Sequence, residues 1–537
     1  MSPEGSQSTL CVAPTGPRSF NPEPTATVRL TVAVGSGLNE RRRLLVGLAP
    51  AFAQRAKSGP YVGLGIVLLA SVIAAGSARP YAGGWNDGSR LATVEALVDQ
   101  GTWAIDASTF VHPPTNAAQT PYDPALPELP AGWTGDKLLI HHHFYSDKPP
   151  VPALLMAGIY RGWQALTGWT VRTHPAAFCY WMTLLSSGLA YVVAVSCIDR
   201  LGSRLGLGLT QRLMLTASFG LATVALPYVR HVNNHILLLG VAAPVMLGLH
   251  DLAERVLSGR STRWRVASLG FLAGLGYTID LGAGPMLMVC ALALVGWRCR
   301  CWLAPAIFLL AAMPWLLLHH GINYATAGTL GPANAVAAYF NWPGSPFNPA
   351  NMTGAFHHTP AHFVEYATAL LLGKRGFLGH NLPLFLAVAG TVGLLRRRVT
   401  QAPEIVFGLC WCGAVWLAYG LTSTNYSGAC CSIRWFVPFL APGYYVLALL
   451  LSRQPRRSSD LTLLTLWGML TAGLMWQAGP WMLHLVPFFW PIQAFALLSW
   501  LSLRRRQAVL PDWTRVPLEH NRKPSRRSPR PSLGLAQ

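Results

Sequence analysis

Long apolar stretches recur along this 537-residue chain, and short arginine-rich connections separate them. Most stretches approach or reach the roughly 17–25 residues that a helix needs to cross a bilayer. The pattern predicts an all-α polytopic membrane protein whose domain, residues 60–503, contains about twelve transmembrane helices. The predicted spans are 61–78, 175–198, 213–229, 236–250, 266–279, 283–297, 302–318, 382–395, 405–421, 435–451, 461–477 and 481–503.

Two long polar segments, residues 80–150 and 319–381, interrupt the apolar pattern. The first contains a predicted short amphipathic helix, residues 87–100, which Gly101 ends. Residues 150–166 are apolar but short and include Arg161, so we expect them to lie in the membrane interface. A helix bundle does not need such a polar segment to stay folded. We therefore expect the first segment to form the reactive face.

The charge distribution orients the bundle. Only 11% of residues are charged, and 41 Lys and Arg against 20 Asp and Glu give a formal charge of +21. Such an excess can indicate nucleic-acid binding, but here the arginines flank apolar stretches, as the positive-inside rule describes. We therefore expect no nucleic-acid partner, and we place the arginine-rich connections in the cytoplasm. Segments 80–150 and 319–381 then lie outside, and residues 1–59 and 504–537 form a disordered and a basic cytoplasmic tail.

This topology brings several polar clusters to the outer side. Asp87 caps its helix, acts as a base, or does both. Lys148 precedes a helix start, where a positive charge is normally unfavourable, and this favours an anionic partner. Arg434 either snorkels to the interface or binds the same anion. Asn234 and His235 either satisfy one another at a helix end or bind substrate.

In these residues the chain resembles the polytopic glycosyltransferases of the GT-C fold, the group that includes protein O-mannosyltransferases and lipid A aminoarabinose transferases. In that group an acidic pair begins a juxtamembrane helix after the first span, and here one of the two acids is replaced by Asn86. An Asp that often precedes a later apolar helix is replaced by Asn234. The motifs that carry the resemblance are Asn86-Asp87, Asp147-Lys148-Pro149 and Arg434-Trp435-Phe436-Val437-Pro438.

The resemblance implies a GT-C-like bundle with juxtamembrane helices in the first outer loop, and a polyprenyl-phosphate sugar as donor. An outward-facing site agrees, because nucleotide sugars are cytosolic. We expect transfer of a hexose or pentose to a hydroxyl of a lipid, glycan or protein acceptor, with inversion, in the bacterial inner membrane. The expected roles are base for Asp87, donor-phosphate binding for Lys148 and Arg434, and substrate binding for Asn86, Asp147, Asn234 and His235. Gly84 and Gly88 are expected to leave room for the acceptor hydroxyl.

A divalent metal ion is the one cofactor to consider, with Asp87 and His235 as weak candidate ligands. One carboxylate with neutral partners binds a hard cation poorly, so we expect weak metal dependence. Two other classes remain open. A transporter would carry ionisable residues at mid-membrane, where this chain has few. A non-catalytic subunit of a cell-envelope polysaccharide assembly system would tolerate the neutral Asn86 and Asn234.

Overall fold

The computed structural model describes residues 60–112, 120–123, 133–348, 359–481 and 486–509. The tail predicted for residues 1–59 and most of the tail predicted for 504–537 lie outside these residues. The described residues belong to one compact unit, which begins at Ser58.

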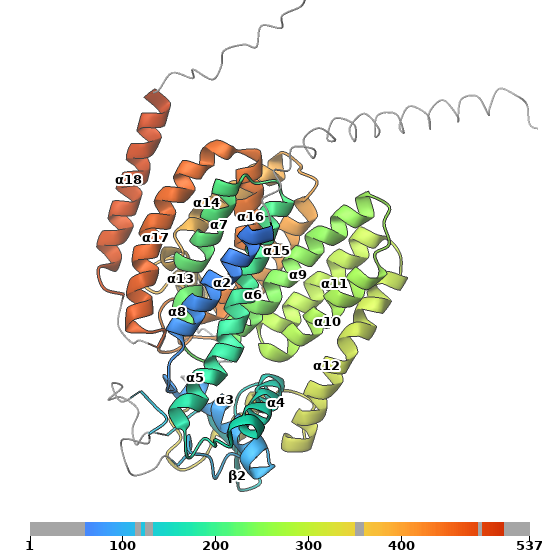
Figure 1. The fold of residues 1–537 in the computed structure, drawn as a ribbon, viewed down its shortest axis with the longest axis vertical. Helices are drawn as coiled ribbons and strands as arrows, with labels where there is room; N and C mark the ends of the chain where they lie inside the picture. The colour runs from blue at the N-terminus through green and yellow to red at the C-terminus, as the bar shows by residue number, and fades with distance from the viewer. Residues whose placement is uncertain (1–59, 113–119, 124–132, 349–358, 482–485, 510–537) are drawn as a thin grey trace, which may run out of the picture. The chain divides into compact units, whose positions relative to one another are not determined.

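A helix occupies the position of each predicted span (Figure 1). The prediction of an all-α polytopic membrane protein is therefore confirmed. The helices at these positions are α2 (Pro60–Ser77), α5 (Pro175–Thr183), α6 (Leu189–Arg204), α7 (Leu209–Leu221), α9 (Asn234–Leu257), α10 (Arg263–Ile279), α11 (Ala283–Cys299), α12 (Leu303–Ala327), α14 (Pro383–Arg396), α15 (Ala402–Thr422), α16 (Leu440–Arg453), α17 (Ser458–Ala478) and α18 (Phe489–Val509).

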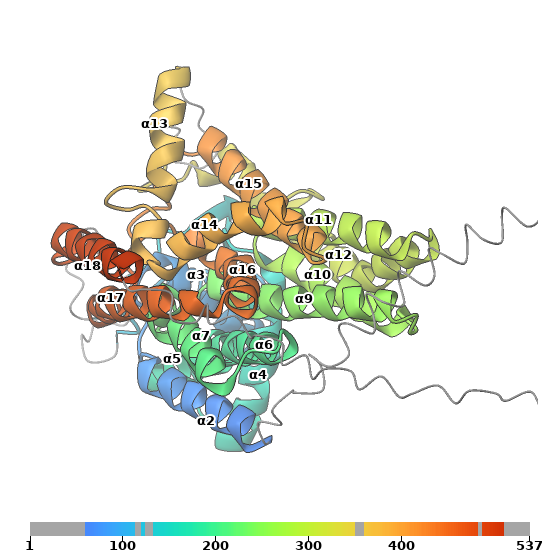
Figure 2. The ribbon, with the colours of Figure 1, turned by 90° about the horizontal axis from the view of Figure 1, so that it is seen from above.

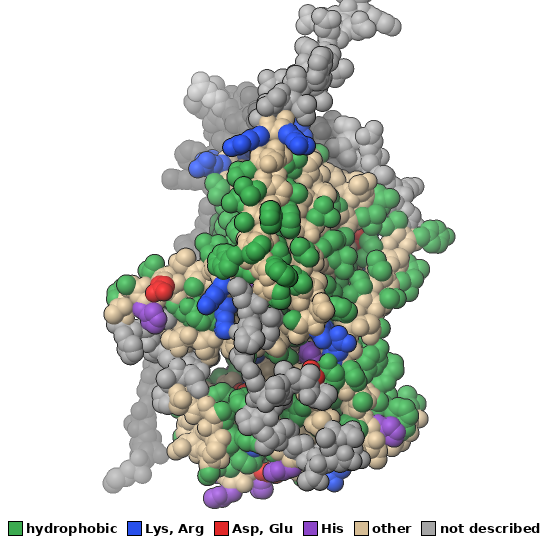
Figure 3. Space-filling view, turned by 90° about the vertical axis from the view of Figure 1, so that its left-hand side faces the viewer, with side chains coloured by type: hydrophobic (Ala, Val, Ile, Leu, Met, Phe, Trp, Pro, Cys, Tyr) green, Lys and Arg blue, Asp and Glu red, His purple; other side chains and the backbone are tan. Residues whose placement is uncertain are grey.

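Among the described residues, six helical segments are long and apolar enough to cross a membrane. They are 175–204, 234–257, 303–327, 402–422, 434–453 and 455–478, and α2, α11 and α14 contribute shorter apolar helices. The total of about twelve spans stays a prediction. On the face shown in Figure 3, hydrophobic side chains cover the middle of the bundle, and Lys and Arg side chains lie at its upper end and also lower on the same face.

A second group of elements lies together at the lower end of the bundle in Figure 1, which we call the polar end. They are α3 (Trp85–Glu95), a π-helical turn (Ala96–Gln100), β1 (Lys137–Ile140), β2 (His143–Ser146) and α4 (Pro150–Thr167). The helix predicted from Asp87 begins two residues earlier, and it ends as predicted at Gly101, whose φ of +69° suits glycine. The antiparallel β1–β2 hairpin was not predicted. Helix α4 packs against α3 and is not among the candidate spans.

Close packing of α10 with α11 and α12 fixes the turn that reaches the polar end. Figure 2 shows these three helices together on one side of the bundle. A Cβ added to Gly274 of α10 would lie 2.8 Å from the Cα of Ala312 in α12. Such small residues let helix backbones approach one another. This packing positions the α10–α11 turn, which carries Asp280.

Candidate active site

A cavity of about 230 Å³ opens at the polar end of the bundle. Its walls come from α3, the segment before α4, the start of α9, the α10–α11 turn and the segment after α15. The predicted site residues that line it are Asn86, Asp147, Lys148, Asn234, His235 and Arg434. The structure therefore brings together residues that lie far apart in the sequence. It adds Arg90, Asp136 and Asp280, which the sequence analysis did not assign to the site.

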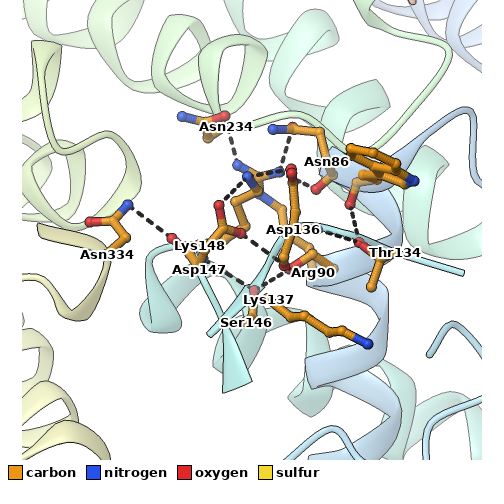
Figure 4. A network of polar contacts seen from close by, with 12 residues as sticks. Asn86, Arg90, Thr134, Asp136, Lys137, Ser146, Asp147, Lys148, Asn234 and Asn334 are labelled. Carbon is orange, nitrogen blue, oxygen red and sulfur yellow. Dashed lines mark hydrogen bonds and ion pairs between the residues drawn. The ribbon is translucent and has the colours of Figure 1, made fainter. Parts of the chain in front are cut away.

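Lys148 lies between two carboxylates in this cavity (Figure 4). Its Nζ is 2.6 Å from Asp136 Oδ2 and 2.8 Å from Asp147 Oδ2, and all three side chains are at most 13% exposed. Burial raises the pKa of Asp147, and the neighbouring Lys148 only partly offsets that effect. Lys148 is therefore not an unpaired interfacial cation, because two internal anions already neutralise it.

A chain of polar contacts crosses the cavity from α3 to the α10–α11 turn. Arg90 donates from Nη1 to Asn86 Oδ1 at 2.6 Å and from Nη2 to Asn234 Oδ1 at 2.8 Å. Asn234 in turn donates to Asp280 Oδ2 at 2.8 Å, and His235 Nδ1 lies 2.7 Å from the same oxygen. The possibility that Asn234 and His235 satisfy one another is not realised, because both contact Asp280.

The buried charges of this chain of contacts have perturbed acidities. The pKa of Arg90 is lowered to about 10, mainly by burial and also by the nearby Arg434, against the raising effect of nearby carboxylates. Burial acts to raise the pKa of Asp280. His235 and the N–H donors of Gly282 and Ala283 nevertheless hold that pKa below its ordinary value. Asp280 is thus an ionised carboxylate whose oxygens are already engaged.

Asp87 lies outside the residues that line the cavity. It is 1% exposed, its Oδ2 accepts a 2.6 Å hydrogen bond from Gly83 N, and His231 Nδ1 lies 3.4 Å from the same oxygen. It is not the N-cap of α3, since Gly84 holds that position. The expected space beside Gly88 is filled, because a Cβ there would lie 2.8 Å from Cε1 of Tyr122.

Arg434 faces the cavity without an ion-pair partner among the described residues. Its guanidinium lies 5.5 Å from the ring centroid of Trp481, and its Nε is buried with no hydrogen-bond partner in the described part of the chain. A half-buried cation without an anion is costly unless a ligand supplies one. Arg434 is therefore the group best placed to receive an anionic ligand.

The second polar segment closes one side of the cavity. Asn334 Nδ2 donates to the backbone oxygen of Asp147 at 2.9 Å, and Phe340 and Phe347 line the wall. A contact outside the cavity ties the same two segments together. There, the Lys137 ammonium lies 4.1–5.0 Å from three aromatic rings, and Trp342 Nε1 donates to Lys137 O at 3.2 Å. The rings are those of Trp133, Phe144 and Trp342.

The candidate metal ligands are not brought into one cluster. Asp87 lies beside His231, whereas His235 lies beside Asp280. The described residues contain no group of three His, Cys, Asp or Glu side chains arranged to hold a metal ion. The carboxylates nearest Lys148 are already paired with it. The arrangement of these residues does not fit a resident metal ion.

No protein-family model and no curated protein matches the chain. It is similar to two solved structures of ArnT, the lipid A aminoarabinose transferase, from Cupriavidus metallidurans. The undecaprenyl phosphate-bound form is 15% identical with a TM-score of 0.46, and the match covers 84% of this chain and 72% of that one. The apo form is 13% identical with a TM-score of 0.45 and coverages of 84% and 70%. The case for a function rests on the cavity itself.

Proposed function

We propose that this chain is a membrane glycosyltransferase that uses a polyprenyl-phosphate sugar as donor. The observation that carries the proposal is the cavity at the polar end, where three cations and three carboxylates face one another at the end of an apolar bundle. Apolar helices suit the lipid tail, and the polar cavity suits a phosphate and a sugar. The cavity lies opposite the arginine-rich connections, so the positive-inside rule puts it on the extracytoplasmic side.

Arg434 and Arg90 are the proposed phosphate ligands, and Lys148 assists them. Arg434 has no internal anion among the described residues, and Arg90 has a buried Nε without a partner there. Arg434 is close enough to Arg90 to lower the pKa of the Arg90 guanidinium by charge repulsion. A phosphate between them would remove this repulsion and accept charge-assisted hydrogen bonds from both. The role predicted for Arg434 is retained, and the role of Lys148 becomes secondary, because Asp136 and Asp147 already neutralise it.

Asp136 is the proposed base. Asp87 is the base predicted from the sequence, and that assignment stays a prediction, but a carboxylate that is 1% exposed is poorly placed to meet an acceptor hydroxyl. Asp280 is occupied by Asn234, His235 and two backbone N–H groups. Asp136 lines the cavity, and within the described part of the chain its carboxylate forms an ion pair with Lys148 alone.

The proposed reaction is a single displacement. The acceptor oxygen attacks C1 of the sugar, the bond from C1 to the phosphate oxygen breaks, and the phosphate leaves with the bonding electrons. Asp136 takes the proton of the acceptor hydroxyl, and the guanidinium groups stabilise the negative charge that grows on the leaving phosphate. Attack from the face opposite the phosphate inverts C1. The acceptor is a lipid, glycan or protein hydroxyl that approaches from outside.

The alternative is a non-catalytic subunit of a polysaccharide assembly system. One observation favours it: neutral Asn86 lines the cavity where the resemblance would place an acid, while Asp87 does not. The test uses the purified full chain with undecaprenyl phosphate and with a panel of undecaprenyl-phosphate hexoses and pentoses. We expect saturable binding of undecaprenyl phosphate and its enzymatic release from at least one sugar conjugate when an acceptor extract is present. Binding without release would assign the non-catalytic role, and absence of binding would overturn the proposal.

A further inference from the structure

A second, larger cavity of about 670 Å³ lies between α14, α16, α17 and α18. Most of its wall is apolar, with Phe385 and Leu450 among the lining residues. Gly393 leaves room in it, because beyond its chain neighbours and the local backbone of its own helix nothing lies within 4 Å of the position that a Cβ would take there. From Leu382 to Arg397 the wall along α14 extends about 22 Å at the helical rise of 1.5 Å per residue. One leaflet of a bilayer has about 15 Å of hydrocarbon, so the cavity is long enough for an acyl chain.

The end of this cavity at the arginine-rich connections is basic. Arg397 and Arg457 both line it. Arg397 is exposed and has no ion-pair partner among the described residues. Arg457 lies 3.2 Å from Asp460, and Arg504 lies 2.6 Å from the same carboxylate oxygen. The single carboxylate of Asp460 therefore pairs with two guanidinium groups, and this end of the cavity keeps a net positive charge.

We propose that this cavity binds one anionic glycerophospholipid of the leaflet at the arginine-rich end. The lipid phosphate lies at Arg397 and Arg457, and the acyl chains run along α14 and α18. Charge complementarity selects this occupant, because basic pockets between helices on the cytoplasmic side attract anionic headgroups. Trp500 lines the same end, where an indole suits the headgroup level of a membrane. The proposal is independent of the transferase function, since it concerns a different cavity.

The test is native mass spectrometry of the full chain released from nanodiscs that contain phosphatidylglycerol and phosphatidylcholine with identical acyl chains. We expect retained phosphatidylglycerol, and an apparent affinity about five- to ten-fold lower in Arg397→Gln. The matched control is Arg398→Gln, which removes a neighbouring exposed charge that does not line the cavity. Gly393→Leu places a bulky side chain at the wall of the cavity and should lower retention. Gly413→Leu adds the same bulk at an equally open glycine of α15 and should not.

Retention of both lipids to the same extent would overturn the anionic selectivity. Retention of phosphatidylglycerol that survives both Gly393→Leu and Arg397→Gln would overturn the site. A dimer in lipid-free detergent that only Gly393→Leu disrupts would assign the cavity to a second copy of the chain instead. Arg397→Gln keeps the test decisive if Gly393→Leu fails to fold, because the polar change lies at an exposed position.

Discussion

Replacing Arg434 with Gln should weaken the binding of undecaprenyl phosphate without unfolding the protein. Loss of a charge-assisted hydrogen bond costs about 1.5–3 kcal/mol, which corresponds to a roughly ten- to hundred-fold higher Kd. The folded protein should tolerate the change, because no described carboxylate relies on Arg434 for neutralisation. Lys148→Met is a less informative variant. It leaves Asp136 and Asp147 without their cation, and breaking a buried ion pair in this way costs about 3–5 kcal/mol of stability.

The assay titrates undecaprenyl phosphate into the detergent-solubilised full chain and follows tryptophan fluorescence, with thermal unfolding measured in parallel. Arg161→Gln is the matched control, since it removes an exposed positive charge of α4 that does not line the cavity. The control separates the loss of a direct contact with the phosphate from a general loss of positive electrostatic potential. An Arg434→Gln protein that unfolds at the parental temperature and binds the lipid with parental affinity would refute the placement of the phosphate.

Four further outcomes are expected. Asp136→Asn should lower turnover by about a hundred-fold or more and leave lipid binding intact, whereas Asp87→Asn should leave turnover close to parental; the opposite result would restore Asp87 as the base. Burial raises the pKa of Glu95 above its ordinary value of 4.5, so the stability linked to its protonation is complete below that pH and is lost as the pH rises through the folded pKa. Glu95→Gln should remove this dependence from thermal unfolding curves recorded across the acid range. Gly88→Ala should destabilise the protein by about 1–3 kcal/mol, because a phenol ring occupies the space. Finally, Ser258→Cys in a background without native cysteines should react with an impermeant thiol reagent only from the cytoplasmic side, and labelling of intact cells would contradict the topology.

The positions of the helices could be predicted from the sequence because a bilayer forces each span to be continuously apolar. The same constraint explains why 87–100 was recognised as a separate short helix. The β1–β2 hairpin was missed because its partner residues lie in a loop, where no membrane restricts the pattern. In particular, His141 and His142 turn the chain at φ values of +50° and +67°, which nothing in the sequence marks.

The lining of the candidate cavity was predicted in part, and helix geometry explains the main omission. Asn86 and Arg90 are four residues apart and so share a face of α3, whereas Asp87 is rotated by about 100° from Asn86. This periodicity places Arg90 on the same face of α3 as Asn86 and places Asp87 on a different face. Asp280 could have been assigned to the candidate site from the sequence, because it is a single acid in the turn between two apolar helices. Asp136 could not have been, since only the folding of the loop brings it to Lys148.

The polar contacts across the cavity join residues that are far apart in the sequence. The candidate site can therefore form only late in the synthesis of the chain. Arg90 and Asn234 are 144 residues apart, and Asp147 and Asn334 are 187 apart. Roughly 340 residues separate Arg90 from Arg434, and translation at about 5–20 residues per second takes on the order of 20–70 s to cover them. Throughout that interval the first polar segment has been synthesised but lacks its later contact partners. A nascent or truncated chain therefore lacks the proposed phosphate site, and we expect it not to bind undecaprenyl phosphate before the bundle is nearly complete.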